Sequence, residues 1–231
     1  MHLFAIGDLH LSFNVEKRMN IFEGWGDYEQ RIKDNWQKSI KADDVVVVAG
    51  DISWGLKLEE TTKDFKFLDT LPGKKLIVKG NHDYWWSTAK KIKEFWDYHD
   101  FNTLDLLHNN AFLFKNIGLC GSRGWLLGEG DEENEKVLNR ETMRLERSIL
   151  SALELGAEEL IVFLHYPPIF IKQRSEKILE ILSDYKEKIK LCCYAHLHGS
   201  SIQFAFNKEY EGIPFKLISA DALNFEPLQI I

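Results

Sequence analysis

The chain has 231 residues, of which 45% are hydrophobic, with a formal net charge of -7 at pH 7. This content suffices for a substantial core, and we expect one domain over residues 1–231. The acidic balance disfavours non-specific nucleic-acid binding. No apolar run approaches the roughly 20 residues of a membrane helix, so we expect no membrane association. The amino-terminal residues lack the basic region of a secretory signal, and the three cysteines fit no metal or redox spacing, which favours a cytoplasmic location.

In the first half of the chain, short apolar runs alternate with helical patterns. The predicted strands cover residues 3–6, 45–48 and 76–78. The predicted helices cover residues 28–40, a segment around 65–71 that stops before Pro72, and a segment from a cap at Ser87 to about residue 98. The alternating order predicts an α/β fold with a parallel sheet and helical crossovers.

The second half is less regular. We expect a hairpin at residues 111–114 and 117–120, a helix at 131–155, a strand at 160–164, a helix at 175–182, a strand at 191–195 and paired strands around 202–206 and 215–218. The segment 121–131 carries four glycines and is predicted to be a loop that borders the functional site.

Five apolar runs lead into residues that are common metal ligands. These residues are Asp8 with His10, Asp51, Asn81 followed by His82 and Asp83, His165, and His196 with His198. In open α/β sheets, ligands bind at the carboxyl ends of strands, so these side chains are expected to converge on one edge. Either Asp-x-His or Gly-Asp alone is weak evidence, whereas all five motifs in order are difficult to obtain by chance.

The chemistry of this set predicts a centre of two metal ions. Seven candidate ligands exceed what one ion with an open position can use, and mixed oxygen and imidazole donors suit Mn, Fe, Zn or Ni better than Ca or Mg. The formal charges of two divalent ions, two carboxylates and a hydroxide add up to a net positive charge, which can bind a phosphate anion. We therefore expect a small phosphorylated substrate and no obligate protein partner.

These motifs, over about residues 3 to 200, resemble the calcineurin-like metallophosphoesterases. The resemblance implies a four-layer α/β/β/α sandwich with two mixed sheets flanked by helices. It also implies cleavage of phosphomonoesters or phosphodiesters by a hydroxide that bridges two divalent ions, with manganese favoured.

The resemblance also implies a role for each ligand. Asp8, His10 and His198 would hold the first ion, Asn81, His165 and His196 the second, and Asp51 would bridge them. His82 would contact the phosphate and protonate the leaving oxygen, with Asp83 orienting its ring. One departure is Ala195, where the family usually has glycine; alanine would be strained there if the backbone needs a positive φ.

Two other functions stay open at this point. A non-catalytic scaffold on the same fold would have lost ligands, and none is missing here. A nuclease would need a basic groove, and the 29 Lys+Arg against 36 Asp+Glu disfavour one.

Several further residues have competing interpretations. Arg123 could clamp the phosphate, although a plain surface arginine is the favoured interpretation. Trp54 and the Tyr84-Trp85-Trp86 run could line the rim of the cleft or pack in the core, and packing is favoured for Trp86.

Overall fold

A computed structural model describes residues 1–125 and 132–231. The chain divides into two compact units, one of Met1–Leu106 with Ile218–Ile231 and one of Leu107–Leu217. Each unit is built on its own mixed sheet flanked by helices, which confirms the predicted fold class. The assignment of the whole chain to one domain stays a prediction.

The sheet of the first unit is mainly parallel. Its strands are β1 (Leu3–Ile6), β2 (Val45–Ala49), β3 (Lys74–Val78), β4 (Leu104–Leu106) and β13 (Leu228–Gln229), in the order β13-β1-β2-β3-β4. Only β13 runs antiparallel to its neighbour, so the predicted parallel arrangement is confirmed. The strands β4 and β13 are short and were not predicted from the sequence.

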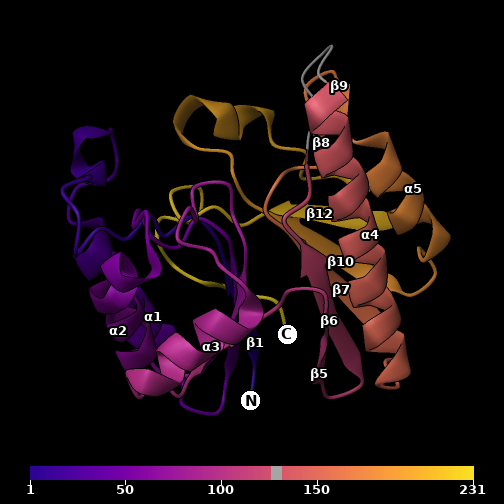
Figure 1. Cartoon of the computed structure of the whole chain (residues 1–231). Coiled ribbons are helices and arrows are strands. Elements are labelled where there is room, and N and C mark those ends of the chain that lie inside the picture. Colours follow the sequence, from indigo (N-terminus) through magenta and orange to yellow (C-terminus); the bar gives the residue numbers. More distant parts are fainter. Residues whose placement is uncertain (126–131) are drawn as a thin grey trace. The chain divides into compact units, whose positions relative to one another are not determined.

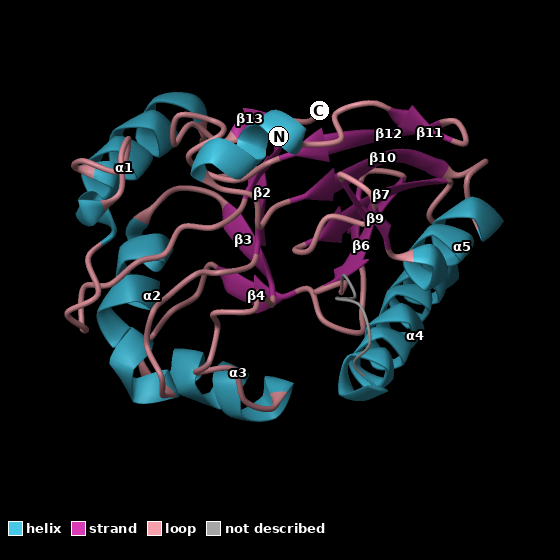
Figure 2. Cartoon of the chain, turned by 90° about the horizontal axis from the view of Figure 1, so that it is seen from above, coloured by secondary structure: helices cyan, strands magenta, loops and turns pink. Residues whose placement is uncertain are grey.

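Three helices cover one face of this sheet: α1 (Tyr28–Ser39), α2 (Thr62–Thr70) and α3 (Ala89–Tyr98) (Figure 1, Figure 2). Their apolar residues recur at helical spacing, and Trp36 of α1 and Trp96 of α3 are buried in the core. The cap of α3 is Thr88, one residue after the predicted Ser87, because the Thr88 hydroxyl accepts the hydrogen bond from the Lys91 amide.

The sheet of the second unit has the order β11-β12-β10-β7-β6-β5. Its strands are β5 (Phe112–Phe114), β6 (Ile117–Ser122), β7 (Glu159–Leu164), β10 (Ile189–Tyr194), β11 (Glu209–Tyr210) and β12 (Ile213–Leu217). The helices α4 (Glu132–Glu154) and α5 (Glu176–Asp184) flank it, and β8 (Ile169–Phe170) pairs with β9 (Gln173–Arg174). The predicted hairpin is confirmed as β5 and β6, with Lys115 in the left-handed region at its turn.

Two predictions in this unit need correction. The predicted strand at 202–206 is wrong, because Gly199–Phe204 forms a 3-10 helix, η3. The Ser201 hydroxyl donates to the His198 carbonyl oxygen, and such local hydrogen bonds of serine compete with strand pairing. The predicted loop at 121–131 is also partly wrong, because Gly121 and Ser122 belong to β6; the remainder of that loop from residue 126 onward lies outside the described residues.

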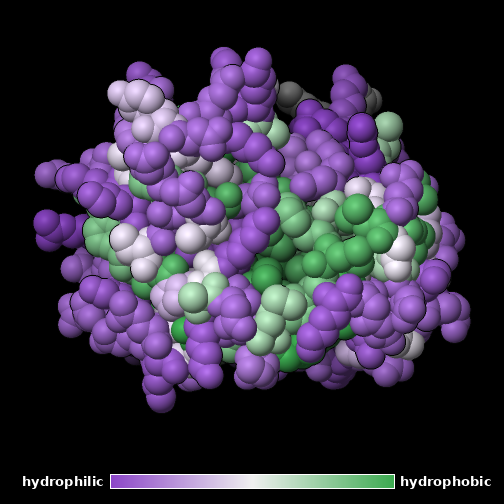
Figure 3. Space-filling model, turned by 90° about the horizontal axis from the view of Figure 1, so that it is seen from below, coloured by the Kyte–Doolittle hydropathy of each residue, from purple (hydrophilic) through white to green (hydrophobic). Residues whose placement is uncertain are grey.

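On the face shown in Figure 3, hydrophilic residues predominate around one area of hydrophobic residues. Among the residues that the structure describes, no helix combines the length and the apolar character needed to cross a bilayer.

Candidate functional site

In the first unit, the segments that follow β1 and β2 run side by side. The Asp8 amide donates to the Gly50 carbonyl at 2.9 Å, and the His10 amide donates to the Asp51 carbonyl at 2.9 Å. These bonds continue the parallel pairing of β1 with β2 beyond the carboxyl ends of both strands. The motifs Asp8-Leu9-His10 and Gly50-Asp51 are therefore neighbours, as the strand-end argument predicted.

The side chains of these two segments also approach one another. A carboxylate oxygen of Asp8 and a ring nitrogen of His10 lie within 4.8 Å. The Nε2 atom of His10 lies 3.8 Å from Oδ2 of Asp51. All three side chains are buried. Buried carboxylates beside an imidazole are costly unless they are paired or bind a cation, so this arrangement fits a metal site.

The backbone at the predicted ligands is unusual. Asp8, His10, Asp51 and His196 have φ values of 60°, 45°, 51° and 74°, in the left-handed region that non-glycine residues rarely adopt. Strain of this kind concentrates at functional sites, where the surrounding structure holds it in place. The strain considered for Ala195 does not arise, because the residue with positive φ is His196 and not the alanine before it.

Asp83 connects the segments that follow β2 and β3. Its buried carboxylate accepts hydrogen bonds from the amides of Gly80 at 2.7 Å, Asp51 at 3.0 Å and Ile52 at 2.8 Å. It also accepts one from the indole N–H of Trp85 at 3.0 Å. Asp83 therefore positions the backbone that carries Asp51. Its predicted role in orienting the His82 ring stays a prediction.

His82 lies beside Asp51, because the His82 amide donates to Oδ1 of Asp51 at 2.7 Å. The Nδ1 atom of His82 lies 3.3 Å from the hydroxyl oxygen of Tyr84, which is 57% exposed. This contact was not predicted from the sequence, although the place of Tyr84 two residues after His82 was a signal for it. Asn81, the residue before His82, is half-buried in the same turn.

Trp54 packs against the candidate ligands. Its ring stacks on that of His10, with centroids 4.8 Å apart, and lies 4.6 Å from that of His82. Only 8% of Trp54 is exposed, so it supports these imidazoles instead of forming an open rim. Trp85 is buried as well, and Trp86 packs against the core as favoured.

In the second unit, His165 follows β7 directly, and His196 lies two residues after β10. The Ala195 amide donates to the His165 carbonyl at 3.0 Å, which continues the parallel pairing of the two strands. The ring centroids of His165 and His196 lie 5.1 Å apart, and their nearest ligand nitrogens lie within 4.8 Å. His198 precedes η3 in an extended conformation.

Arg123 is not the plain surface arginine that was favoured. Its side chain is 14% exposed, and it pairs with the buried carboxylate of Glu141 at 3.4 Å. Its carbonyl oxygen accepts from the amides of His165 and Tyr166. Burial lowers the pKa of Arg123, with Glu141 acting in the opposite direction. The backbone of Arg123 thus supports the His165 segment.

The three cysteines are buried and free, and burial raises the pKa of each thiol well above its usual range. A thiol that stays protonated is a poor metal ligand, so the histidines, carboxylates and Asn81 are the candidate donors. Their carboxylate, amide and imidazole atoms fit transition-metal ions. Within the first unit these donors are Asp8, His10, Asp51 and Asn81, and within the second they are His165, His196 and His198.

Strand-end carboxylates and histidines on an α/β fold of this kind define a protein with candidate ligands for transition-metal ions. The family model of the calcineurin-like phosphoesterases matches residues 1–200. The chain belongs to the calcineurin-like phosphoesterase family.

Solved structures share the fold at low sequence identity. A protein of unknown function, AQ665 from Aquifex aeolicus, is 17% identical with a TM-score of 0.53, covering 99% of this chain and 95% of that one. The phosphopantetheinyl hydrolase PptH from Mycobacterium tuberculosis is 14% identical with a TM-score of 0.59, covering 100% and 95%. The protein TT1561 of Thermus thermophilus is 13% identical with a TM-score of 0.54, covering 85% and 82%. No curated protein sequence matches the chain.

Proposed function

We propose that this protein is a metal-dependent phosphohydrolase that cleaves phosphomonoesters or phosphodiesters with two divalent ions, manganese being favoured. The ligands would be Asp8, His10, Asp51, Asn81, His165, His196 and His198, as in the family pattern. The observation that carries the proposal is that the candidate ligands lie close together after the strands of each unit. In the first unit these are Asp8, His10 and Asp51, and in the second they are His165 and His196.

Each protein group has a role in this proposal. Bound ions would supply positive charge that lowers the pKa of water and neutralises phosphoryl oxygens. The imidazole of His82 donates a proton to the leaving oxygen, and the Tyr84 hydroxyl at its Nδ1 atom orients the ring. Asp83 holds the amides of Asp51 and Gly80, which keeps the Asp51 carboxylate in place.

The substrate in this proposal is a small phosphorylated molecule and not a nucleic acid. A net charge of -7 gives long-range repulsion toward a polyanion, whereas a local metal centre still attracts one phosphate group.

The experiment that tests the proposal measures metal content and turnover together. Purified protein loaded with Mn²⁺ should hold about two ions per chain and should hydrolyse p-nitrophenyl phosphate or its bis-ester. Asp51→Asn should lower kcat/KM by at least about 100-fold and reduce the bound metal, because it removes a charge between two cations. Asp97→Asn, at an exposed site on α3, is the matched control and should behave as the wild type. Near-normal turnover by Asp51→Asn, or a metal-loaded wild type without turnover on either ester, would refute the proposal.

A further inference from the structure

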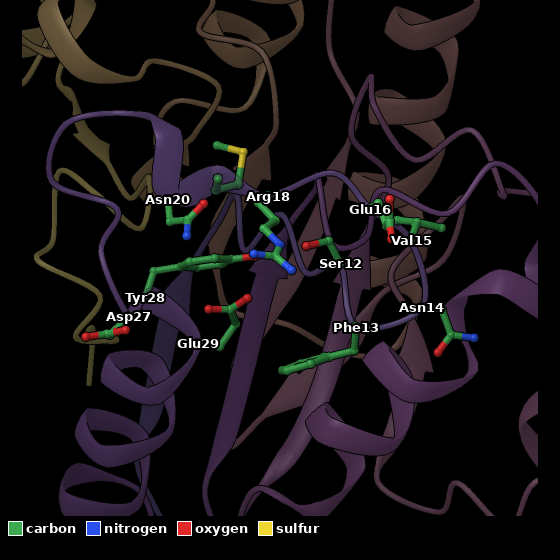
Figure 4. A pocket seen from close by; sticks show the side chains of 11 residues that line it. Ser12, Phe13, Asn14, Val15, Glu16, Arg18, Asn20, Asp27, Tyr28 and Glu29 are labelled. Carbon is green, nitrogen blue, oxygen red and sulfur yellow. The ribbon is translucent and has the colours of Figure 1, made fainter.

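A pocket of about 410 Å³ lies in the first unit, outside the set of candidate ligands. The segment that follows His10 and the start of α1 form its walls, and Figure 4 shows their side chains around the cavity. Its volume falls in the range of small-ligand pockets, which is about 300–1,000 Å³.

The lining combines several acceptors, one cation and two aromatic rings. Three carboxylates, two amides and one guanidinium line it: Glu16, Asp27, Glu29, Asn14, Asn20 and Arg18. Ser12 adds a hydroxyl group, and Phe13 and Tyr28 contribute the aromatic rings. In Figure 4, Arg18, Glu29 and Ser12 project around Tyr28.

The pocket is tied directly to the candidate site. The buried hydroxyl of Tyr28 donates to the carbonyl oxygen of His10 at 2.8 Å. The first lining residue, Ser12, is only two positions after His10. The wall of the pocket therefore includes the residue that bonds to the His10 backbone.

We propose that this pocket binds the leaving group of the substrate and that this group is polyhydroxylated, as in a sugar or a sugar alcohol. The inference rests on the proposed function and adds a substrate class to it. Each hydroxyl is both a donor and an acceptor, so carboxylates and amides accept from it while a guanidinium donates to it. The Phe13 ring, which lines the pocket and is 39% exposed, offers an apolar face to the C–H groups of such a molecule.

The same lining disfavours other leaving groups. Three carboxylates against one arginine repel a second anionic group such as a carboxylate or phosphate. An acyl chain would desolvate the charged groups without pairing them, which is costly. A cationic amine would pair with the carboxylates, so phosphoethanolamine is the strongest competing substrate.

The test is a comparison of leaving groups with Mn²⁺-loaded protein. Sorbitol 6-phosphate, phosphoethanolamine and hexyl phosphate are compared with p-nitrophenyl phosphate, each also as its methyl diester. The sorbitol esters should give the highest kcat/KM among the three alkyl esters. The measured quantity is kcat/KM for the sorbitol ester divided by kcat/KM for the p-nitrophenyl ester. Glu29→Gln and Arg18→Ala should each lower this ratio about tenfold, because each removes a hydrogen bond to a charged group. The change should come mainly from a higher KM for the sorbitol ester.

Two controls and one binding measurement make the outcome decisive. Glu94→Gln on α3 and Lys33→Ala on α1 change exposed residues outside the pocket and should leave the ratio unchanged. Preference for the ethanolamine or hexyl ester, or pocket variants that match the controls, would overturn the inference. Calorimetric binding of sorbitol 6-phosphate, weakened about tenfold by Glu29→Gln, tests the pocket independently of turnover. If only the hydrolysis of the p-nitrophenyl esters fails, the result counts against the proposed function. If Glu29→Gln binds sorbitol 6-phosphate as tightly as the wild type does, the result counts against the proposed role of the pocket.

Discussion

A Cβ atom placed on Gly80 would stand 2.1 Å from Oδ1 of Asp51 and 2.2 Å from its backbone nitrogen. No real Cβ tolerates such contacts, so the turn after β3 approaches Asp51 in a way that only glycine permits. The same Oδ1 atom accepts a hydrogen bond from the His82 amide, so the close approach of the two segments also positions the backbone of His82.

We expect Gly80→Ala to displace the Asp51 segment. The neighbours of the added methyl group include the backbone nitrogen of Asp51, which cannot move away unless the whole segment shifts. The free energy of unfolding should fall by about 1–3 kcal/mol, and kcat/KM should fall about 100-fold because catalytic groups tolerate little misplacement. Gly26→Ala is the matched control for denaturant unfolding, because nothing lies within 4 Å of its Cβ position. Equal unfolding midpoints for both variants would contradict the steric argument.

Asp83→Asn should destabilise the metal-free protein. The buried carboxylate accepts from the amides of Gly80, Asp51 and Ile52 and from the Trp85 indole, whereas an asparagine turns one acceptor oxygen into a donor that faces N–H groups. Loss of about 3 kcal/mol in the free energy of unfolding is expected from denaturant titration in the presence of a chelator. Asp97→Asn on α3 serves as the control. A loss below about 0.5 kcal/mol, typical of exposed sites, would show that these bonds are not important.

Tyr84→Phe should change the dependence of the rate on the leaving group. If the Tyr84 hydroxyl orients His82 for proton donation, its removal slows esters whose leaving oxygen needs a proton. We expect kcat for phenyl phosphate to fall about fivefold and kcat for p-nitrophenyl phosphate to fall less, because p-nitrophenolate leaves as an anion. Tyr98→Phe, at an 82% exposed tyrosine, is the control. An equal loss on both esters would point to a structural effect alone.

Asp64 should titrate unusually late for an aspartate. Burial raises its pKa to about 6, although hydrogen bonds from the Ser53 hydroxyl and the Phe13 amide act in the opposite direction. The folded state therefore binds more protons than the unfolded state between about pH 4 and 6, so this group lowers stability as pH rises through that window. The expected loss is on the order of 2–3 kcal/mol above pH 6.

The measurement for Asp64 is a carboxyl titration by NMR. One aspartate signal should have its midpoint near pH 6 and should be absent from Asp64→Asn but present in Asp97→Asn. The slope of stability against pH between about 4 and 6 should also become more positive in Asp64→Asn than in the wild type, because the variant lacks the destabilising ionisation. The signal that disappears in Asp64→Asn is the Asp64 signal of the wild type. If that wild-type signal titrates near pH 4, the Asp64 carboxylate is not held in an apolar environment.

Local patterns in the chain were sufficient for most elements and for the candidate ligands. The valines of β2 and the helical spacing of Trp36 are signals within a few residues, so strands, helices and the order of the motifs could be predicted. Elements with short or conflicting local signals were less predictable. The strands β4 and β13 have only three and two residues. The segment predicted as a strand at 202–206 falls partly in η3, where the Ser201 hydroxyl bonds to the His198 carbonyl oxygen.

The sequence alone determined which residue types stand at the strand ends, and hence the family and the expected metal chemistry, because those depend on identity and order. Only the tertiary structure decided how these residues are held. The bonds from the Asp51 amide to Asp83 and from Tyr28 to the His10 carbonyl join positions 32 and 18 residues apart. Contacts between residues so far apart in the sequence depend on how the chain packs. The same packing maintains the left-handed backbone at Asp8, His10 and Asp51.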